Sequence, residues 1–506
     1  MMKQITKHFM AFFLSLLMAV SMGLTAFAED EASGPYKLTL NGTAAGHTYE
    51  AYQIFSGDLS TNAKGKKVLS NVAWGKSVTY TATATEEKSA ADVAKELGDG
   101  EMTIADLADK LTLTTPAKTV ESAEGSTVID ELAAGYYLVK DKDGTQNGKS
   151  DAYTEFIVQV VGDTVADVKS DVPTVVKKVK DTNDSTGKTT NWQDSADYDI
   201  GDDVPYQITG TMPKNIADYT SYKYVFTDTM SKGLTYTPHT AKIMIGDKDV
   251  TSFFEETVTP NTDDVPTTVT WTCNDLKGIK GVTLDEKTKV VVTYTAKLNE
   301  KAVIGSAGNP NTVNLTYSNN PNKGGEEDTG KTPDDKNIVF TYKVVVNKKD
   351  EKNEDLPGAE FTLSKVNADK TSTIVKTFTL TGNKENDPTT FTATGLDDGT
   401  YVLKETKTPE GYNTIADQYF TITATHDETA DNPGLTSLSG DKLTSSAQTT
   451  ITFTAAKDAG SLTTDVVNKK GSTLPSTGGI GTTIFYAAGG ALVVLAGVMI
   501  AARKKA

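Results

Sequence analysis

The sequence has very little of the residues that build disulfides and metal centres. Its 506 residues include one cysteine, Cys273, and only 4 histidines. A single cysteine excludes an intramolecular disulfide, a cysteine-based zinc site and an iron–sulfur centre. The histidines form no catalytic or ligand pattern, and no His-Glu-x-x-His, Gly-x-Ser-x-Gly or glycine-rich phosphate loop after a strand occurs. An enzyme is therefore the least supported class, and neither a cofactor nor a metal is expected.

Basic residues are also scarce relative to acids. There are 50 lysines and arginines against 67 aspartates and glutamates, which gives a formal net charge of −17. Because binding to a nucleic acid backbone relies on clustered basic side chains, nucleic acid is not expected as a partner. One acidic run, with aspartates at positions 194, 197, 199, 202 and 203, lacks the spacing of an EF-hand calcium loop. We expect it to be a solvated loop.

The N-terminus has the pattern of a secretory signal. Lys3 and Lys7 precede an apolar run from Phe9 to Val20, and the small residues Ala26 and Ala28 follow. The apolar run is too short to span a bilayer comfortably, so cleavage after Ala28 is expected, with residues 1–28 removed. The exported protein must therefore be stabilised without disulfides.

The C-terminus carries a composite signal. Residues 480–502 contain no charge and are followed by Arg503, Lys504 and Lys505, which predicts a membrane-spanning helix with a basic cytoplasmic tail. Immediately before this span the chain reads Leu474-Pro475-Ser476-Thr477-Gly478. The arrangement resembles the cell-wall sorting signal of Gram-positive surface proteins. The resemblance implies that the helix retains the chain only temporarily in the membrane, and that a sortase thiolate attacks the Thr477 carbonyl before transfer to an amine.

Between these two signals the sequence predicts β-structure. Alternating β-branched and aromatic residues, as in 289–294 and 340–346, are separated by glycine-containing turns. One stretch, Ser89 to Leu111, has helical spacing and is broken at residues 98–100, which predicts two short helices. The expected fold class is all-β, with tandem sandwich domains and a few short helices in the first of them.

Composition divides the chain into three domains. The segment 319–333 has no apolar residue except proline and is expected to be an exposed linker, and a weaker break occurs near residue 171. We predict domains at 29–170, 171–333 and 334–472, followed by the sorting signal at 473–506. Residues 135–141 and 399–405 match position for position, which indicates a weak internal repeat.

The third domain carries a set of three chemically matched residues. Lys348 lies in the alternating stretch 342–350, Glu405 lies in the segment Glu-Thr-Lys-Thr-Pro-Glu-Gly-Tyr, and Asn468 closes the last strand. Together these motifs resemble the collagen-adhesin B-type (CnaB-like) immunoglobulin-fold domain. The resemblance implies a spontaneous amide bond between Lys348 and Asn468, assisted by Glu405. Burial favours this chemistry, because a buried lysine loses its proton and a buried glutamate gains one.

The second domain is similar to the middle isopeptide domain of Gram-positive backbone pilins. The stretches that carry the resemblance are residues 173–181, 224–234 and 315–321. It implies a bond between Lys177 and Asn319 with Asp228 as the acid, and Asn320 is the alternative acceptor because the register at a strand end is uncertain. In the first domain Asp141 occupies the acid position, but its closing strand has no matching asparagine, and we predict no crosslink there.

The leading hypothesis is the major subunit of a covalent pilus, linked head to tail to identical subunits, joined by minor pilins and anchored to peptidoglycan. Its expected sortases are a class C pilin polymerase and a housekeeping enzyme. Lys169 is the candidate linkage lysine, although the Tyr-Pro of the family motif is absent, and Lys178 and Lys180 compete with it. The alternative is a monomeric wall-anchored adhesin that binds a host or bacterial surface ligand.

Overall fold

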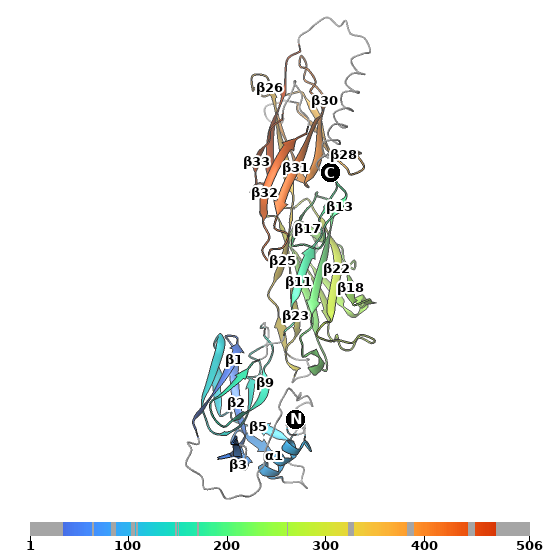
Figure 1. Cartoon of the computed structure of the whole chain (residues 1–506). Coiled ribbons are helices and arrows are strands. Elements are labelled where there is room, and N and C mark those ends of the chain that lie inside the picture. Colours follow the sequence, from blue (N-terminus) through green and yellow to red (C-terminus); the bar gives the residue numbers. More distant parts are fainter. Residues whose placement is uncertain are drawn as a thin grey trace, which may run out of the picture.

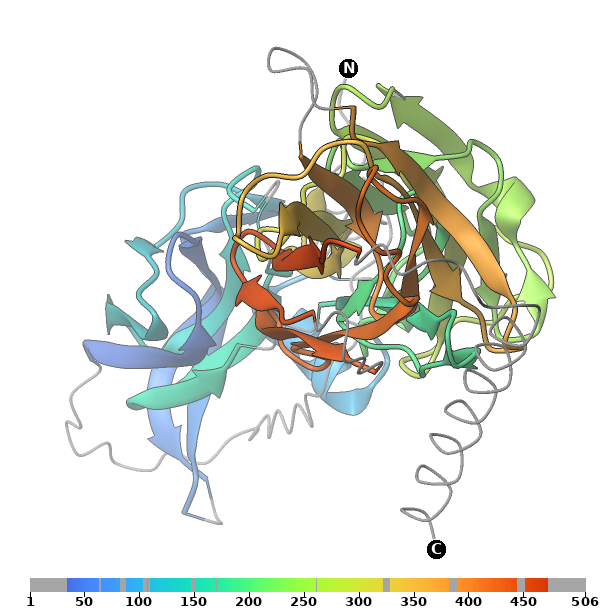
Figure 2. The ribbon, with the colours of Figure 1, turned by 90° about the horizontal axis from the view of Figure 1, so that it is seen from above.

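The protein is described by a computed structural model. It describes residues 34–471 apart from short gaps at 63–64, 82–87, 103–106, 108–109, 147–148, 150, 169–171, 261, 322–327, 382–388 and 444–450. Three β-rich domains follow one another along an elongated molecule (Figure 1). Seen from above, the C-terminal domain is stacked on the middle domain, and the N-terminal domain lies to one side (Figure 2). The predicted all-β class is confirmed.

The N-terminal domain has two main sheets and two cores. Its three-stranded sheet has the order β10-β1-β7, and its five-stranded sheet has the order β3-β2-β8-β9 with β6 beside β2, while β4 and β5 form a separate pair. The strands are β1 (Tyr36–Thr43), β2 (Thr48–Thr61), β3 (Lys67–Trp74), β4 (Val78–Tyr80), β5 (Leu111–Leu113), β6 (Lys118–Glu121), β7 (Gly125–Leu132), β8 (Gly135–Asp141), β9 (Glu155–Val160) and β10 (Thr164–Asp167).

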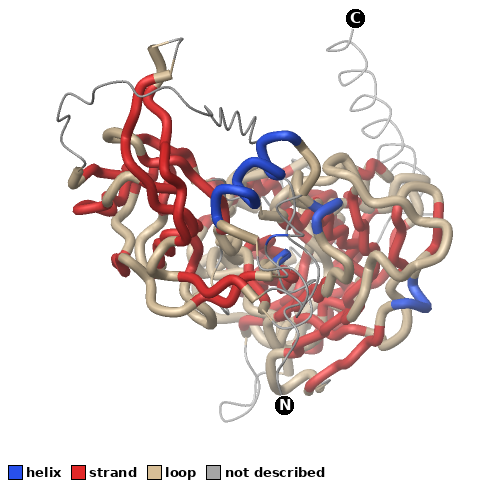
Figure 3. Tube along the Cα trace, turned by 90° about the horizontal axis from the view of Figure 1, so that it is seen from below, coloured by secondary structure: helices blue, strands red, loops and turns tan. Residues whose placement is uncertain are grey.

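The helix of this domain, α1 (Ala90–Asp99), begins where the sequence predicts (Figure 3). Ser89 caps it by accepting a hydrogen bond from the backbone of Asp92, and the Asp92 side chain accepts one from the Ser89 backbone in return. Gly100, in the left-handed conformation, ends it. The apolar face at Val93 and Leu97 is buried in one of the two cores. The second predicted helix falls mostly outside the described residues.

The middle domain is a sandwich of a six-stranded and a seven-stranded sheet. Their orders are β11-β15-β22-β18-β19 with β17 beside β22, and β14-β25-β23-β16-β21-β20 with β24 beside β23. The strands are β11 (Val175–Val179), β12 (Thr182–Asn183), β13 (Lys188–Thr189), β14 (Ser195–Asp197), β15 (Asp203–Thr211), β16 (Tyr224–Met230), β17 (Leu234–Tyr236), β18 (Lys242–Ile245), β19 (Lys248–Asp249), β20 (Glu255–Thr259), β21 (Thr267–Cys273), β22 (Lys289–Leu298), β23 (Asn309–Ser318), β24 (Thr329–Lys331) and β25 (Asp335–Phe340). Two short 3₁₀ turns, η1 (Ile216–Asp218) and η2 (Thr251–Phe253), lie in its loops.

The C-terminal domain is a smaller sandwich of a four-stranded and a five-stranded sheet. Their orders are β29-β26-β34-β33 and β28-β27-β30-β31-β32. The strands are β26 (Tyr342–Asp350), β27 (Glu360–Val366), β28 (Ser372–Thr379), β29 (Thr390–Leu396), β30 (Gly399–Lys407), β31 (Gln418–His426), β32 (Leu435–Lys442), β33 (Thr454–Ala456) and β34 (Ser461–Asn468). The first strand β26 and the last strand β34 are parallel neighbours. The two repeated sequence segments form the matching strands β8 and β30.

Two expectations about the connections are wrong. The predicted boundary at 334 falls before β25, which belongs to the middle domain because it pairs with β23 and β14. Only Thr341 separates β25 from β26. The described ends of the predicted exposed linker are partly buried: Asn319, Asn320 and Asp328 are buried, and β24 pairs with β23, while Lys331 and Pro333 are exposed. A segment without apolar side chains is buried here through hydrogen bonds.

The aspartate run that we expected to be a solvated loop is instead partly buried. Asp194 is 5% exposed and Asp197 is 2% exposed, because β14 pairs with β25 at the junction with the C-terminal domain. Only Asp203 of this run is well exposed. The sequence pattern of alternating acids and small residues gives no sign that a second domain covers this strand.

Within the described residues, no helix is long and apolar enough to cross a membrane. The predicted spanning segment 480–502 and the predicted signal 1–28 both lie outside the described residues.

A glycine pair at the junction between the middle and C-terminal domains gives a test of the fold. Gly460 has φ +59°, and a Cβ there would lie 2.5 Å from the Gly305 Cα, whereas Gly246 has φ +56° and open space around it. Gly460→Ala and the control Gly246→Ala each place an alanine in the left-handed conformation, which costs about 1 kcal/mol. We expect Gly460→Ala to lower the free energy of unfolding by a further ~1–3 kcal/mol through overpacking. Thermal unfolding of the two variants checks this, and equal effects would contradict the described junction.

Candidate crosslinking sites

Lys177 is a fully buried lysine in the core of the middle domain. Alternation along β11 turns Val175, Lys177 and Val179 inward, and Lys177 is 0% exposed. Its Nζ lies 5.0 Å from the ring centre of Tyr206 and 5.1 Å from that of Tyr294. The two rings stack on each other in the same sheet and shield the amine from water. Burial of a charged amine costs free energy, so the groups that contact Lys177 Nζ determine whether it is protonated.

The partners of Lys177 are a carboxyl group and a phenol. Nζ is 2.8 Å from both oxygens of Asp228 and donates to the Tyr294 hydroxyl at 2.6 Å. The Tyr294 hydroxyl in turn donates to Asp228 Oδ2. Asp228 lies on β16 in the middle of the opposite sheet and is itself 0% exposed. The structure therefore brings together the lysine and the acid that the sequence pairs.

Burial changes the protonation of this pair in opposite directions. Desolvation lowers the pKa of Lys177, although the charge and hydrogen bond of Asp228 oppose it. Desolvation raises the pKa of Asp228, against the opposing effect of Lys177. Both shifts favour a neutral amine beside a neutral carboxylic acid. A neutral amine has the free lone pair that a nucleophile needs, and a carboxylic acid can supply a proton to a leaving group.

The asparagine that reaches this group is Asn311. Its Nδ2 donates to the Tyr294 hydroxyl at 2.9 Å, so the amide and the Lys177 amine share one oxygen atom. Asn311 is 0% exposed, and its Oδ1 has no hydrogen-bond partner. On β23, Val313 lies opposite Asp228, and Asn311 lies two residues before Val313 on the same buried face. Diagonal neighbours of this kind are within reach of one another.

The two asparagines favoured by the sequence are not at this site. Asn319 is six residues beyond the Val313 that faces Asp228, which is about 20 Å along an extended strand. Its Nδ2 donates instead to the Gln146 and Asp151 carbonyls of the N-terminal domain, at 3.0 and 3.2 Å. Asn320 donates to Asp328 at 2.8 Å. The structure thus brings Asn311, and neither Asn319 nor Asn320, to the Lys177 group. Asn311 shares the inward alternation of β23 and could have been found by continuing that alternation toward the N-terminus.

The C-terminal domain places its trio on neighbouring elements. Lys348 and Asn468 both point into the core from the parallel strands β26 and β34, and both are 0% exposed. In the register Lys348 faces Val466, two residues before Asn468. The Asn468 Nδ2 donates to both oxygens of Glu405, at 2.8 and 3.0 Å, and its Oδ1 has no hydrogen-bond partner. The Asn468 side-chain amide is thereby held through its nitrogen, and its carbonyl oxygen accepts no hydrogen bond.

The surroundings of Lys348 favour its neutral form. Desolvation lowers its pKa from the usual value to about 8, although the charges of Glu405 and Asp350 oppose the shift. Its Nζ donates a hydrogen bond to the Lys349 carbonyl at 3.0 Å. Glu405 accepts additional hydrogen bonds from the Ile415 backbone and the Thr408 hydroxyl, at 3.0 and 3.2 Å, which fix its position on β30.

The corresponding acid of the N-terminal domain has a histidine as its partner. Asp141 is 0% exposed and lies 2.9 Å from His47 Nδ1, and His47 Nε2 lies 3.4 Å from Asp151. Burial alone would lower the pKa of His47, but hydrogen bonds and charges of the two aspartates outweigh it and raise the pKa to about 9. The cluster is therefore suited to an ion pair with a charged histidine, whereas burial lowers the pKa of the corresponding lysine in each of the other two domains.

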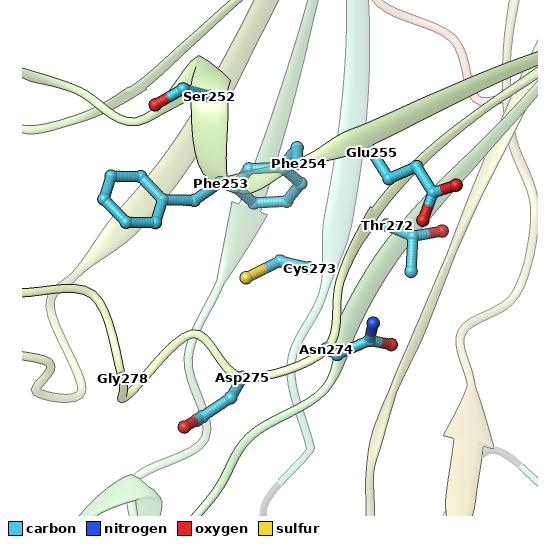
Figure 4. Close-up of a pocket in the computed structure, with 9 residues that line it drawn as sticks. All are labelled: Ser252, Phe253, Phe254, Glu255, Thr272, Cys273, Asn274, Asp275 and Gly278. Atoms are coloured by element: carbon cyan, nitrogen blue, oxygen red, sulfur yellow. The ribbon is translucent and has the colours of Figure 1, made fainter.

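The one cysteine lines a shallow hollow of the middle domain. Phe253, Phe254 and Asp275 surround Cys273 in a hollow of about 490 Å³ (Figure 4). The thiol is 3% exposed, and burial raises its pKa to about 11. A thiol in that state is a poor nucleophile, so Cys273 acts as a small core residue, as its apolar sequence neighbours predict.

Three groups of predicted residues remain. Lys169 and the sorting residues 474–478 lie outside the described residues. Of the competing lysines, Lys178 pairs with Asp194 at 2.5 Å, and Lys180 Nζ lies 5.0 Å from the ring centre of Trp192. Lys178 and Lys180 therefore each interact with a side chain of the middle domain.

Three parts of the chain match known protein families. Residues 200–321 match the family described as Gram-positive pilin backbone subunit 2, Cna-B-like domain. Residues 342–433 match the prealbumin-like fold domain named SpaA, and residues 466–506 match the LPXTG cell wall anchor motif. Together these matches indicate a sortase-assembled pilus backbone subunit. Backbone pilins are structural proteins, and the anchor motif assigns this pilin to the cell wall of a Gram-positive bacterium.

Individual relatives extend over nearly the whole pilin chain. The trypsin-resistant surface T6 protein of Streptococcus pyogenes is 24% identical, over 97% of this chain and 99% of its own. The structure of the T6 backbone pilin aligns with a TM-score of 0.51 at 17% identity, over 88% of this chain and 100% of its own. The major pilin SpaD of Corynebacterium diphtheriae aligns with a TM-score of 0.48 at 20% identity, over 88% and 100%.

The His47 cluster generates a pH test. Its folded-state pKa of about 9 exceeds the usual 6.5, so its stabilisation is complete below about pH 6.5 and is lost as pH rises through about 9. We expect the unfolding transition of the N-terminal domain to lose about 2–3 kcal/mol over that interval. His47→Gln should remove most of this dependence of domain stability on pH. Calorimetric melts across this range measure it, and a wild-type domain equally stable at both ends would show that the pair is not ionised.

Proposed function

We propose that this pilin is the major backbone subunit of a covalently polymerised pilus, and that its middle and C-terminal domains each contain a Lys–Asn isopeptide bond. In the middle domain the bond would join Lys177 to Asn311, with Asp228 as the acid. In the C-terminal domain it would join Lys348 to Asn468, with Glu405 as the acid. The observation that carries the proposal is that the buried Lys177 amine and the Asn311 amide share the Tyr294 hydroxyl.

The middle-domain reaction needs no group beyond these four side chains. The neutral Lys177 Nζ attacks the Asn311 Cγ and forms the new C–N bond. The Cγ–Nδ2 bond breaks, and the former amide nitrogen leaves as ammonia. Asp228 gives a proton to the leaving nitrogen and recovers one from Nζ, and the Tyr294 hydroxyl contacts all three groups and can pass protons between them. Fixed positions in a dry core supply the effective concentration that amide exchange otherwise lacks.

The C-terminal reaction would follow the same scheme with a different arrangement. Glu405 contacts the nitrogen of Asn468 that must leave, so it is placed to protonate it. The lowered pKa of Lys348 supports attack by its neutral amine. Because β26 and β34 are the first and last strands of the domain, the bond would join its two ends directly.

The two bonds would replace the disulfides that the chain lacks. In a loop-closure model, a crosslink across a loop of more than 100 residues stabilises a domain by about 4–5 kcal/mol. The bond in the C-terminal domain would also carry a pulling force between the chain ends in place of the hydrogen bonds of the strands. The mature subunit would end at Thr477, and a lysine of the next subunit, for which Lys169 is the candidate, would accept the sortase-bound chain.

Intact mass is the direct test of the bonds. Each bond removes one ammonia, about 17 Da, so the mature chain should be about 34 Da lighter than its sequence mass. Lys177→Ala or Asn311→Ala should each remove half of the deficit, and Lys348→Ala should remove the other half. A wild-type mass equal to the sequence mass would overturn both bonds.

Asn319→Ala is the matched control for Asn311→Ala. Both asparagines are fully buried and lie on β23 or at its end, but only Asn311 contacts the Tyr294 hydroxyl. Asn319→Ala should therefore keep the full deficit and weaken the contact between the N-terminal and middle domains. Loss of half the deficit in Asn319→Ala, with none in Asn311→Ala, would return the assignment to Asn319.

Polymerisation is tested on the cell surface. Wall extracts of cells that produce the chain with its own sortases should contain a ladder of species that resists boiling in detergent. Substitution of Thr477 should abolish the ladder, because no acyl-enzyme can form. A single wall-linked species from the wild-type chain would instead support the monomeric adhesin, with a host or bacterial surface molecule as its ligand.

A further inference from the structure

Lys177, the nucleophile of the proposed middle-domain bond, lies on an edge strand. β11 is the end strand of its sheet and pairs with β15, where Lys177 faces Ile208. The other edge of β11 lies beside β25, which belongs to the opposite sheet of the sandwich (Figure 1). Because Lys177 is 0% exposed, any of its backbone groups that point to this edge need partners from outside their own sheet.

Two side chains of β25 supply these partners. The Lys177 N–H donates to Asp335 Oδ2 at 2.5 Å, and the Lys177 carbonyl accepts a hydrogen bond from Asn337 Nδ2 at 3.1 Å. In an antiparallel ladder the N–H and the carbonyl of one residue point to the same side, so both groups of Lys177 point away from β15. The side chains of Asp335 and Asn337 thus take the place of a strand ladder between β11 and β25.

Asn337 is anchored in the core where it does this. It is 0% exposed, and its Nδ2 also donates to the Asp194 carbonyl at 3.1 Å. The backbone N–H of the next residue, Ile338, donates to the same carbonyl at 3.2 Å. Asn337 therefore connects β25 both to β11 and to the segment that leads into β14.

The backbone of β25 holds the strand of the other reactant. On β23, Asn311 lies directly opposite Asn337. Val313, two residues further on, lies opposite Asp335 of β25 and opposite Asp228 of β16. Residues directly opposite one another point to the same face of a sheet, so the Asn311 and Asn337 side chains share the core face. One short stretch of β25 therefore binds the nucleophile through side chains and the acceptor strand through its ladder.

This arrangement sets the distance between the two groups that must react. Amide formation needs the amine close to the carboxamide carbon, and a misplacement of about 1 Å can cost about 100-fold in rate. We propose that Asp335 and Asn337 are positioning residues, which fix the Lys177 backbone to the strand that also pairs with the acceptor. The inference rests on the proposed bond between Lys177 and Asn311. Both residues act through the Lys177 backbone and take no part in the proton transfers.

The role of β25 also gives the reaction an order. β25 follows the acceptor strand in the sequence and leads through Thr341 directly into β26 of the C-terminal domain. The middle-domain bond should therefore form only after the chain beyond Asn311 has returned to the sheet as β25. A chain that has been synthesised or exported only as far as the acceptor strand should keep a free Lys177 amine.

Time-resolved intact mass of the newly synthesised mature chain tests the positioning role. The wild-type chain from cell-free synthesis should lose about 34 Da in two steps of about 17 Da, and peptide mapping assigns each step to its domain. Asp335→Ala should slow the middle-domain step about tenfold or more, because the Lys177 N–H loses its acceptor. The step in the C-terminal domain should keep its wild-type rate and serves as the internal control.

Rescue by a conservative variant separates positioning from a general loss of stability. Asp335→Asn keeps an oxygen that can accept from the Lys177 N–H and should restore the wild-type rate. Asn337→Ala, which removes the donor to the Lys177 carbonyl, should be as slow as Asp335→Ala. Folding is checked in Asn311→Ala, which lacks the acceptor: addition of Asp335→Ala to it should leave the middle domain folded at the temperature of the synthesis.

Asp334→Ala is the matched control, because Asp334 accepts its hydrogen bond from Asn314 of β23, at 2.9 Å, and not from Lys177. It should react at the wild-type rate. The proposal is overturned if Asp335→Ala and Asn337→Ala react as fast as the wild type, if Asp335→Asn is as slow as Asp335→Ala, if Asp334→Ala is equally slow, or if Asp335→Ala unfolds the uncrosslinked domain. A wild-type chain without a mass deficit would instead overturn the proposed bond itself.

Discussion

The burial of a lysine amine in a sandwich core is the constraint on which the middle domain depends. Lys177 has no exposed surface, and its neighbours are two stacked tyrosines, one aspartate and one asparagine. An ammonium in that position is unfavourable unless a carboxylate pairs with it, and a permanent pair of charges in a dry core is itself expensive. The proposed conversion of the amine to an amide would remove the need to keep an ammonium in the core. The arrangement that is poorest as an ion pair is therefore the one best suited to react.

The sequence determines much of this arrangement because strand alternation is a local property. Lys177 alternates with Val175 and Val179, and Lys348 follows Val344 and Val346 on the same face. Asp228, Glu405 and Asn468 were expected from the family resemblance, and the structure buries all five residues. Asn311, the acceptor proposed for the middle domain, was missed for a physical reason. Alternation assigns Asn311 and Asn319 to the same face of one strand, and only the pairing of β23 with β16 decides which of them lies near Asp228. Register between distant strands is not encoded in local periodicity.

The domain junctions were the least predictable part of the fold. A stretch such as 319–333 has the composition of an exposed linker, yet its described ends make hydrogen bonds to two domains. Asp197 on β14 and Asp194 just before it likewise have the sequence context of a solvated loop, yet both are buried, and the Asp194 backbone donates to Glu428 of the C-terminal domain. Burial of polar segments depends on partners from other parts of the chain, and composition carries no information about those partners.

The passage of one extended segment from β25 into β26 has a mechanical consequence. Thr341, the residue between the strands, is 0% exposed, and its hydroxyl donates a hydrogen bond to the Leu396 carbonyl at 3.2 Å. A coiled linker stores slack and behaves as an entropic spring under low tension, whereas a chain already near full extension has almost no length to release. Tension between the middle and C-terminal domains is thus transmitted without delay or lengthening. A fibre of such subunits should resist small forces as a stiff rod and yield only when a domain itself gives way.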